Sequence, residues 1–217
     1  MIPGLSVEIG REAVVVRWPL LLRVLSSAVV GGGLAEARAV INLHVAKDDP
    51  CVDPPGLIET FARRAAVHEP YVGLLTSAWT EHATVGEAAG FGFQAVAVAT
   101  VGLSNRIAAG RSAARPWVPS TINTIVVVEA DPEPAALVNA VITATEVKAL
   151  ALMEASIGDG DGGPATGTST DAVVIAATGR GPRARFGGPA SELGWVIGRA
   201  VREALANGIR GWKERNP

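Results

Sequence analysis

The chain has 217 residues, of which 48% are hydrophobic and 18% are charged, and its formal net charge is −2. This composition excludes intrinsic disorder, because so apolar a chain can bury enough surface to offset its ordering entropy. There is no basic excess to neutralise phosphates, so no nucleic-acid partner is expected. The single cysteine, Cys51, rules out an intrachain disulfide and a cysteine-based zinc site.

The start of the chain carries Glu8, Arg11 and Glu12 where a secretory signal would need an apolar run. The longest uncharged stretch, residues 88–105, is interrupted by glycines and amides, and its apolar part has a β-like pattern. We therefore expect a soluble, cytoplasmic protein that does not bind a membrane. The sequence leaves the formation of a homo-oligomer open.

The first half of the chain is expected to be rich in β-structure. Strands are predicted at 5–9, 13–17, 39–45, 72–76 and 95–101. The first two flank Gly10 and Arg11, which predicts a hairpin. A helix is predicted over 54–67, where apolar residues recur at helical spacing after two prolines. Residues 104–120, which include Arg106, Arg111, Arg115, Pro116 and Pro119, are expected to form an exposed loop.

In the second half, strands are predicted at 122–128 and 172–177, separated by a helix that starts near Pro132 and ends near Ser156. Ser191 is expected to cap a last helix that ends just before Gly208, with Gly194 and Gly198 allowing close approach to the sheet. These elements predict one domain over residues 1–217. Its expected class is α/β or α+β, a layered sandwich in which mixed β-sheet is flanked by about three main helices.

Two motifs do not meet the structural requirements of the sites they imitate. Gly90-Phe91-Gly92 matches a loose dinucleotide fingerprint, but an apparent strand follows it where a helix is needed. Asp159 and Asp161 imitate the start of a calcium loop, but Pro164 takes the place of the required glycine. Neither motif is expected to bind its ligand.

The helix around residues 143–153 contains Glu146 and Lys148 among residues that are apolar almost all round. Such a helix is expected to be buried, so both charges need partners. Residues two apart on a helix face nearly opposite sides, so the two cannot satisfy each other. A structural ion-pair network and a catalytic role are equally open for them.

The segment 165–171 places four hydroxyl groups, a glycine and Asp171 before a predicted strand. Hydroxyl and turn N–H groups can bind an anion or a developing oxyanion. The alternative is a capping box, Thr168-x-x-Asp171, at the start of a helix. Val173, Val174 and Ile175 favour a strand, which weakens that alternative.

Taken together, the polar motifs resemble the adenosylcobinamide amidohydrolase (CbiZ) family in nearly full-length order. The most specific part is the pair Thr145-Glu146-x-Lys148 and Ala165-Thr166-Gly167-Thr168-x-Thr170-Asp171. The remaining motifs are Ser26-Ser27, Gly32-Gly33, Asn42, Thr100-x-Gly102-x-x-Asn105, Thr121-Ile122-Asn123 and Leu193-Gly194. The sequence departs from the family pattern at Val101, Arg106, Ser120 and Val147, and Arg106 bears on substrate fit.

The resemblance implies hydrolysis of the amide that joins aminopropanol to a corrin side chain, which yields adenosylcobyric acid during corrinoid salvage. The corrinoid substrate carries its own cobalt, so no cofactor or protein-bound metal is expected. A metal held by Glu146 and Asp171 is the alternative. A corrinoid-binding module without catalysis and an amidase with another small substrate are the other hypotheses.

The hydrolysis needs an oxyanion donor, a base and an acid for the leaving amine. We assign Glu146 as the base or acid, because burial would raise the pKa of its carboxylate. Lys148 is expected to activate a hydroxyl or to hold a carboxylate, most readily Asp171. The turn formed by Thr166, Gly167 and Thr168 is expected to supply oxyanion donors. Substrate binding is assigned to Asn105, Asn123, Thr145 and Thr170, and attack by water or by a hydroxyl is left open.

Overall fold

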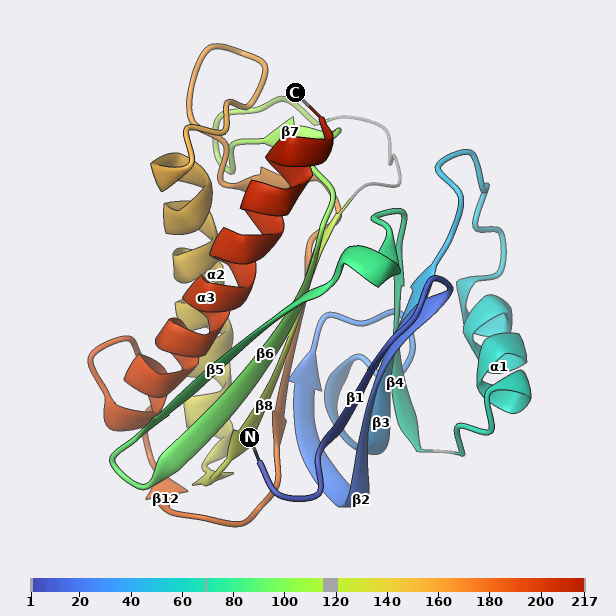
Figure 1. The fold of residues 1–217 in the computed structure, drawn as a ribbon. Helices are drawn as coiled ribbons and strands as arrows, with labels where there is room; N and C mark the ends of the chain where they lie inside the picture. Colours follow the sequence, from blue (N-terminus) through green and yellow to red (C-terminus); the bar gives the residue numbers. More distant parts are fainter. Residues whose placement is uncertain (1, 69, 115–120, 217) are drawn as a thin grey trace.

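The computed structural model describes residues 2–68, 70–114 and 121–216, and this part of the chain forms one mixed sheet with three α-helices (Figure 1). The helices are α1 (Pro54–Arg64), α2 (Pro134–Glu154) and α3 (Glu192–Arg215), with a 3-10 turn η1 (Thr80–His82). The main strands are β1 (Ser6–Ile9), β2 (Ala13–Ser26), β3 (Gly33–His44), β4 (Tyr71–Thr76), β5 (Thr84–Gly90), β6 (Phe93–Val101), β8 (Ile122–Glu129) and β11 (Ala172–Ala177). Four two-residue strands complete the list: β7 (Arg106–Ile107), β9 (Asp131–Pro132), β10 (Gly167–Thr168) and β12 (Arg183–Ala184).

The eight main strands form a single sheet in the order β4-β3-β2-β11-β8-β6-β5, with β1 beside β2. The pairs β3–β4 and β8–β11 are parallel and the other pairs are antiparallel. Strand β2 is the turning point. Its residues 14–17 pair with β1, its residues 23–26 pair with β11, and its register with β3 shifts between Arg17 and Leu22, around Pro19.

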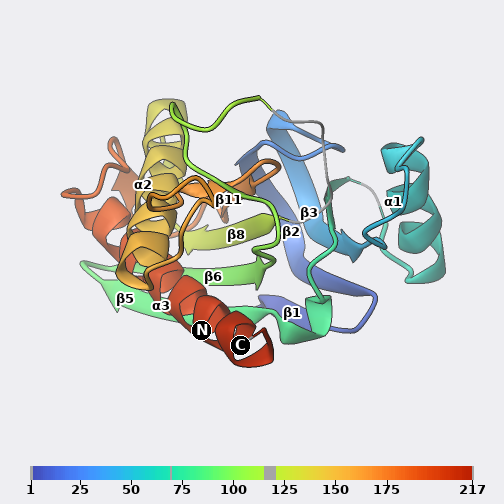
Figure 2. The same cartoon turned by 90° about the horizontal axis from the view of Figure 1, so that it is seen from above.

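The sheet folds over so that its two halves face each other, which produces four layers (Figure 2). One apolar cluster lies between the halves, with Val14 and Val24 of β2 against Val96 of β6 and Val127 of β8. A second cluster lies between the β11-β8-β6-β5 half and helices α2 and α3, and a third lies between β2, β3 and α1. The predicted layered sandwich is confirmed, with helices outside and sheet inside.

The predicted strands and their hairpin are present, and β11 matches its predicted span. Phe91 and Gly92, with φ of 56° and 81°, form the tight turn between β5 and β6, so the fingerprint-like motif is a hairpin turn. The loop expected over 104–120 contains the short strand β7. Residues Arg115, Pro116 and Pro119 lie outside the described part of the chain.

Helix α3 begins as predicted, with the Ser191 hydroxyl accepting from the Gly194 N–H at 3.1 Å. Its predicted end is wrong, since the helix continues through Gly208 to Arg215. A Cβ on Gly208 would lie 2.7 Å from Val101 Cγ2 of β6, so this glycine lets the helix pack on the sheet. Gly198 instead faces Val147 of α2, so its expected contact with the sheet is not made.

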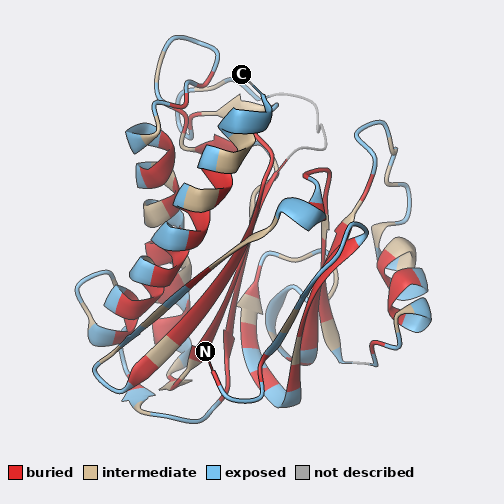
Figure 3. Cartoon of the chain, in the orientation of Figure 1, coloured by how far each residue is buried: buried red, intermediate tan, exposed pale blue. Residues whose placement is uncertain are grey.

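Helix α2 is not buried all round, contrary to expectation (Figure 3). One side packs on β11 and α3, while Val138, Ile142, Leu150 and Met153 are about half exposed. By length and composition alone, α2 is apolar enough to cross a membrane. Its packing against β11 and α3 is that of a core helix in a soluble α/β domain.

Gly86 provides a test of how closely α3 lies on the sheet. A Cβ at this position would overlap the Ala200 carbonyl and lie 2.7 Å from the Ala204 N, both in the backbone of α3. Gly86→Ala should therefore lower the free energy of unfolding by about 1–3 kcal/mol in urea titrations. Gly188→Ala, where no atom lies within 4 Å of the added Cβ, is the matched control. Equal stability of the two variants would contradict the close packing.

Candidate active site

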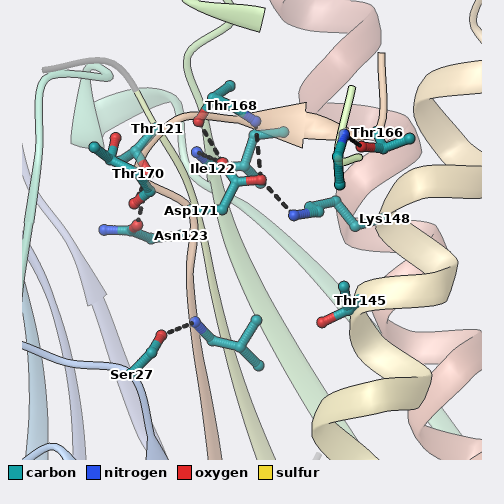
Figure 4. A network of polar contacts seen from close by, with 12 residues as sticks. Ser27, Thr121, Ile122, Asn123, Thr145, Lys148, Thr166, Thr168, Thr170 and Asp171 are labelled. Carbon is teal, nitrogen blue, oxygen red and sulfur yellow. Dashed lines mark hydrogen bonds and ion pairs between the residues drawn. The ribbon is translucent and has the colours of Figure 1, made fainter. Parts of the chain in front are cut away.

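Asp171 lies between β10 and β11, and its carboxylate accepts hydrogen bonds from four donors (Figure 4). Oδ1 accepts from the Ile122 N–H at 3.0 Å and from the Thr168 hydroxyl. Oδ2 accepts from the Thr168 N–H at 3.0 Å and from Lys148 Nζ. An ionised carboxylate offers about four lone-pair positions. The protein itself therefore occupies the acceptor capacity of this side chain.

Lys148 extends from the buried face of α2 to reach Asp171. The side chains of both residues are only 10% exposed. A cation at this depth needs a paired anion, because an uncompensated buried charge is strongly destabilising. The expectation that Asp171 is the partner of Lys148 is confirmed, and the pair ties α2 to the start of β11.

Position 167 must be a glycine, because the Lys148–Asp171 pair lies directly against the backbone there. A Cβ at Gly167 would overlap Asp171 Oδ2 and lie 2.9 Å from Lys148 Nζ. Thr168 and Asp171 do make the side-chain-to-backbone bond of a capping box, but a strand follows them and no helix begins there. The segment thus serves the ion pair rather than a helix end.

A second polar chain crosses between the two halves of the sheet. Thr121 Oγ1 lies 2.7 Å from the Thr170 carbonyl and 3.2 Å from Asn123 Oδ1. Asn123 Nδ2 donates to Asn42 Oδ1 at 2.8 Å and to the Leu75 carbonyl at 2.9 Å. Asn42 in turn donates to Thr100 Oγ1 at 3.0 Å. These bonds join β3, β4, β6 and β8 beside Asp171.

A cavity of about 290 Å³ opens beside this series of hydrogen bonds. Asp171, Thr121 and Thr170 form one wall, and Ser27 and Ser77 contribute hydroxyl-bearing side chains from the ends of β2 and β4. Its remaining lining residues are mostly apolar: Val29, Val45, Pro50, Cys51, Pro54, Leu74, Leu75, Thr76 and Ala172. A mostly apolar cavity with a few polar groups is typical of a small-molecule site.

Cys51 lines this cavity but is poorly suited to act as a nucleophile. Burial, and after it the nearby Asp49 carboxylate, raises the pKa of the Cys51 thiol. A thiol with a raised pKa is protonated at neutral pH, and the thiolate is the reactive form.

The structure brings most of the predicted site residues together. The ion-pair cluster consists of Lys148, Gly167, Thr168 and Asp171 (Figure 4). Asn123 and Thr170 belong to the neighbouring series of hydrogen bonds that runs through Thr121. Asn123 is 1% exposed, and both N–H groups and the carbonyl oxygen of its amide have protein partners. Both N–H donors of its buried amide are used within the protein, so it positions other residues and has no donor left for a corrin amide.

Glu146 is not part of this cluster, and the expectation that it is buried is wrong. It lies on the exposed side of α2, where among the described residues it has no hydrogen-bond or ion-pair partner. Residues two apart on a helix point to opposite sides, so burying Lys148 turns Glu146 outward. Thr145 is also exposed, and its hydroxyl donates to the Val141 carbonyl at 2.8 Å, one turn earlier in the same helix.

The remaining predicted residues hold the surrounding loops in place. Thr166 Oγ1 accepts from the Ala109 N–H at 2.8 Å, and Asn105 Nδ2 donates to Ser169 Oγ at 2.7 Å. The N–H and hydroxyl of Thr168 both go to Asp171, so this turn has fewer oxyanion donors than expected. Arg106 donates to the Gly158 carbonyl at 2.9 Å and to the Leu103 carbonyl at 2.8 Å, which is a structural role.

Asp159 fastens the loop that leads into β10. Its carboxylate accepts from the Asp161 N–H at 2.9 Å, the Gly163 N–H at 3.0 Å and the Arg111 guanidinium. The bond from Arg111, followed by the bond from the Gly163 N–H, lowers the pKa of Asp159 to about 2. The Asp159 carboxylate is thus held by three protein donors.

Sequence reasoning did not assign Ser27, Asn42, Ser77 or Thr121 to the site. Asn42 and Thr121 interrupt or precede apolar strands, the same signal that identified Asn123. Ser77 follows a strand in a stretch that reads as an ordinary turn, so no sequence signal distinguishes it.

The four-layer sandwich is a fold that this chain shares with solved structures. A β-aminopeptidase from Burkholderia sp. has the same fold, with a TM-score of 0.53, 14% identity and coverage of 96% of this chain and 84% of that chain. The PH0078 protein from Pyrococcus horikoshii OT3 aligns with a TM-score of 0.50 and 12% identity, covering 97% of this chain and 80% of its own.

Sequence comparison identifies the family. Residues 4–217 match the family described as adenosylcobinamide amidohydrolase. A relative of that name from Methanosarcina mazei is 31% identical over 196 residues, which is 84% of this chain and 88% of the relative. The chain belongs to the adenosylcobinamide amidohydrolase family.

Replacing Asp171 tests whether the carboxylate organises the site. Asp171→Asn keeps the shape but removes the charge that holds Lys148, leaving a buried cation uncompensated. We expect a loss of about 3–5 kcal/mol in the free energy of unfolding, measured by urea denaturation. Glu146→Gln makes the same chemical change on an exposed carboxylate and should alter stability by less than about 0.5 kcal/mol. Similar losses in both variants would contradict the assigned anchor.

Asp159 predicts a specific dependence of stability on acid. The pKa of Asp159 in the folded protein is about 2, below its usual value of 3.8, so its stabilising contribution is complete above pH 3.8 and is lost as the pH falls towards 2. The stability difference between the wild type and Asp159→Asn should therefore be constant near neutral pH and shrink below about pH 4. Urea titrations at stepped pH measure it. In an Arg111→Met background, most of the stability difference caused by Asp159→Asn should disappear, because Arg111 is the main cause of the lowered pKa. A difference between wild type and Asp159→Asn that does not change with pH would contradict this prediction.

Proposed function

We infer that this protein hydrolyses adenosylcobinamide at the amide joining aminopropanol to the corrin side chain. Water adds across the C–N bond, so the products are adenosylcobyric acid and free aminopropanol. Membership of the adenosylcobinamide amidohydrolase family supports this reaction. The observation that carries the mechanism is the buried Lys148–Asp171 pair beside a cavity.

Lys148 has donor capacity that the fold does not use. An ammonium group has three N–H donors, and Asp171 is the acceptor found for Nζ among the residues the structure describes. Two donors therefore have no acceptor in the described part of the chain, and Asp171, which holds Lys148, lines the cavity. We assign them to stabilising the oxyanion of the tetrahedral intermediate and to delivering a proton to the departing amine.

Asp171 acts through Lys148 and Thr168 rather than as a base. Because its oxygens accept four hydrogen bonds, a fifth proton or a metal ion would have to displace one of them. The carboxylate keeps Lys148 charged and correctly placed, and it orients the Thr168 hydroxyl so that the oxygen lone pairs point away from Asp171. In this proposal the Thr168 oxygen accepts a hydrogen bond from the attacking water, and the proton that this water loses replaces the one that Lys148 gives to the departing amine.

The saturation of Asp171 also supports a reaction that needs no protein-bound metal or cofactor. The cobalt belongs to the substrate and stays in the corrin ring. Among the described residues, no three His, Cys, Asp or Glu side chains gather into a metal site. We also propose that the enzyme acts in the cytoplasm, in keeping with its soluble α/β domain.

The activity can be measured by incubating the protein with adenosylcobinamide and a chelator, and then quantifying released aminopropanol and adenosylcobyric acid by liquid chromatography. We expect turnover to persist in the chelator. Lys148→Met should lower kcat by about a hundredfold or more, because it removes the preorganised donor. Glu146→Gln, on the exposed side of the same helix, should retain turnover.

Three outcomes would contradict the proposal. Corrinoid binding without release of aminopropanol would indicate a binding module. Activity lost in the chelator and restored by a divalent ion would establish a metal-dependent reaction. Normal turnover by Lys148→Met would remove Lys148 from the mechanism.

A further inference from the structure

Ser77 differs from the other polar residues of the cavity wall. It follows β4 at residue 77, is 7% exposed, and its Oγ is buried without a hydrogen-bond partner in the described part of the chain. The neighbouring hydroxyls are occupied, since Ser27 Oγ accepts from the Val173 N–H at 3.1 Å and Thr76 Oγ1 accepts from the Ala78 N–H at 3.1 Å.

A hydroxyl buried in this way is costly to the free protein. Leaving a buried polar group unpaired costs about 1–3 kcal/mol, and native structures contain few such groups. Ser77 lines the cavity, and a serine hydroxyl turns among three staggered positions without moving the backbone. A ligand in the cavity can therefore supply the missing partner.

The size of the cavity limits which part of the substrate enters it. A volume of about 290 Å³ lies at the lower limit for drug-sized ligands, and a corrin ring with its amide arms is far larger. The ring must remain outside while one arm enters. Val29, Val45 and Leu74 suit the short carbon chain of aminopropanol, whose polar groups are its amide nitrogen and one hydroxyl.

Resting on the proposed function, we propose that Ser77 is the hydrogen-bond partner of the aminopropanol hydroxyl. Each hydroxyl can donate or accept, so one hydrogen bond between them gives both groups a partner. Asp171 lines the same cavity, which brings the amide at the root of the arm to the Lys148–Asp171 cluster. The enzyme is thereby selective for amides of short hydroxyalkyl amines over amides of simple alkyl amines.

The test compares two substrates and two proteins. The kcat/KM is measured for adenosylcobinamide and for the propylamide of adenosylcobyric acid, which lacks only the hydroxyl of the aminopropanol arm. The wild type should prefer adenosylcobinamide by about three- to tenfold, and Ser77→Ala should show little preference. Its melting temperature should equal or exceed that of the wild type, because the variant removes an unpaired buried hydroxyl.

Ser26→Ala is the matched control. Ser26 is also buried, but its hydroxyl bonds to the Gly31 carbonyl and the Ala28 N–H, and it does not line the cavity. This variant should lose stability and keep the preference of the wild type for adenosylcobinamide.

Other outcomes overturn the assignment. Ser77 also borders a second cavity of about 340 Å³ that contains Lys47, His82 and Arg215. If Ser77→Ala lowers kcat/KM equally for both substrates, the Ser77 hydroxyl serves the second cavity or stabilises the fold. In that case the proposal is wrong. If the wild type hydrolyses neither substrate, the proposed function fails and the proposal falls with it.

Discussion

The buried Asp171 carboxylate is the constraint on which the rest of the site depends. It is approached from α2 by Lys148, from β8 by the Ile122 N–H and from its own loop by Thr168. A negative charge at this depth is tolerated only with such complete pairing. Removing any donor would therefore loosen the contact of a helix, a strand end or a loop with the site, in addition to contacts such as the β8–β11 pairing.

The polar groups of the site divide into those the protein uses and those it leaves for a ligand. Asn123 and Asp171 are fully engaged within the chain, and they fix the geometry. Within the residues that the structure describes, two N–H donors of Lys148 and the hydroxyl of Ser77 have no protein partner. The first group holds the structure of the site, and the second group is available to the substrate. Donors held in place in advance need no rearrangement when charge develops on the substrate. The unpaired hydroxyl lowers stability in the free protein, and binding of the substrate recovers that free energy.

Much of the fold was predictable from local patterns, and the failures have physical causes. Two kinds of segment could be predicted because each imposes its own local structure. They are continuous β-branched runs such as β8 and the polar segment around Thr168. The burial of Lys148 followed from the apolar surroundings, but the same reasoning wrongly buried Glu146, because composition does not reveal which side of α2 meets the sheet. Gly208 looked like a helix end, but its close tertiary contact with Val101 gives another reason for a glycine at this position. Ser77 required coordinates, since a hydroxyl is conspicuous only when its neighbours have partners and it has none.

The bend in β2 connects these local features to function. Ser77 follows β4 and Asp171 precedes β11, and in the flat order of the sheet two strands, β3 and β2, separate β4 from β11. Folding the sheet at the register shift between Arg17 and Leu22 sets the two halves face to face, and Asn123 of β8 then reaches the Leu75 carbonyl of β4 directly. The same fold closes one cavity with Ser77 on one wall and Asp171 on another. In an unbent sheet the donor for the arm and the ion pair for the amide would belong to distant strands. A single interrupted strand thus brings the two groups proposed for recognition and hydrolysis, Ser77 and the Lys148–Asp171 pair, to one cavity.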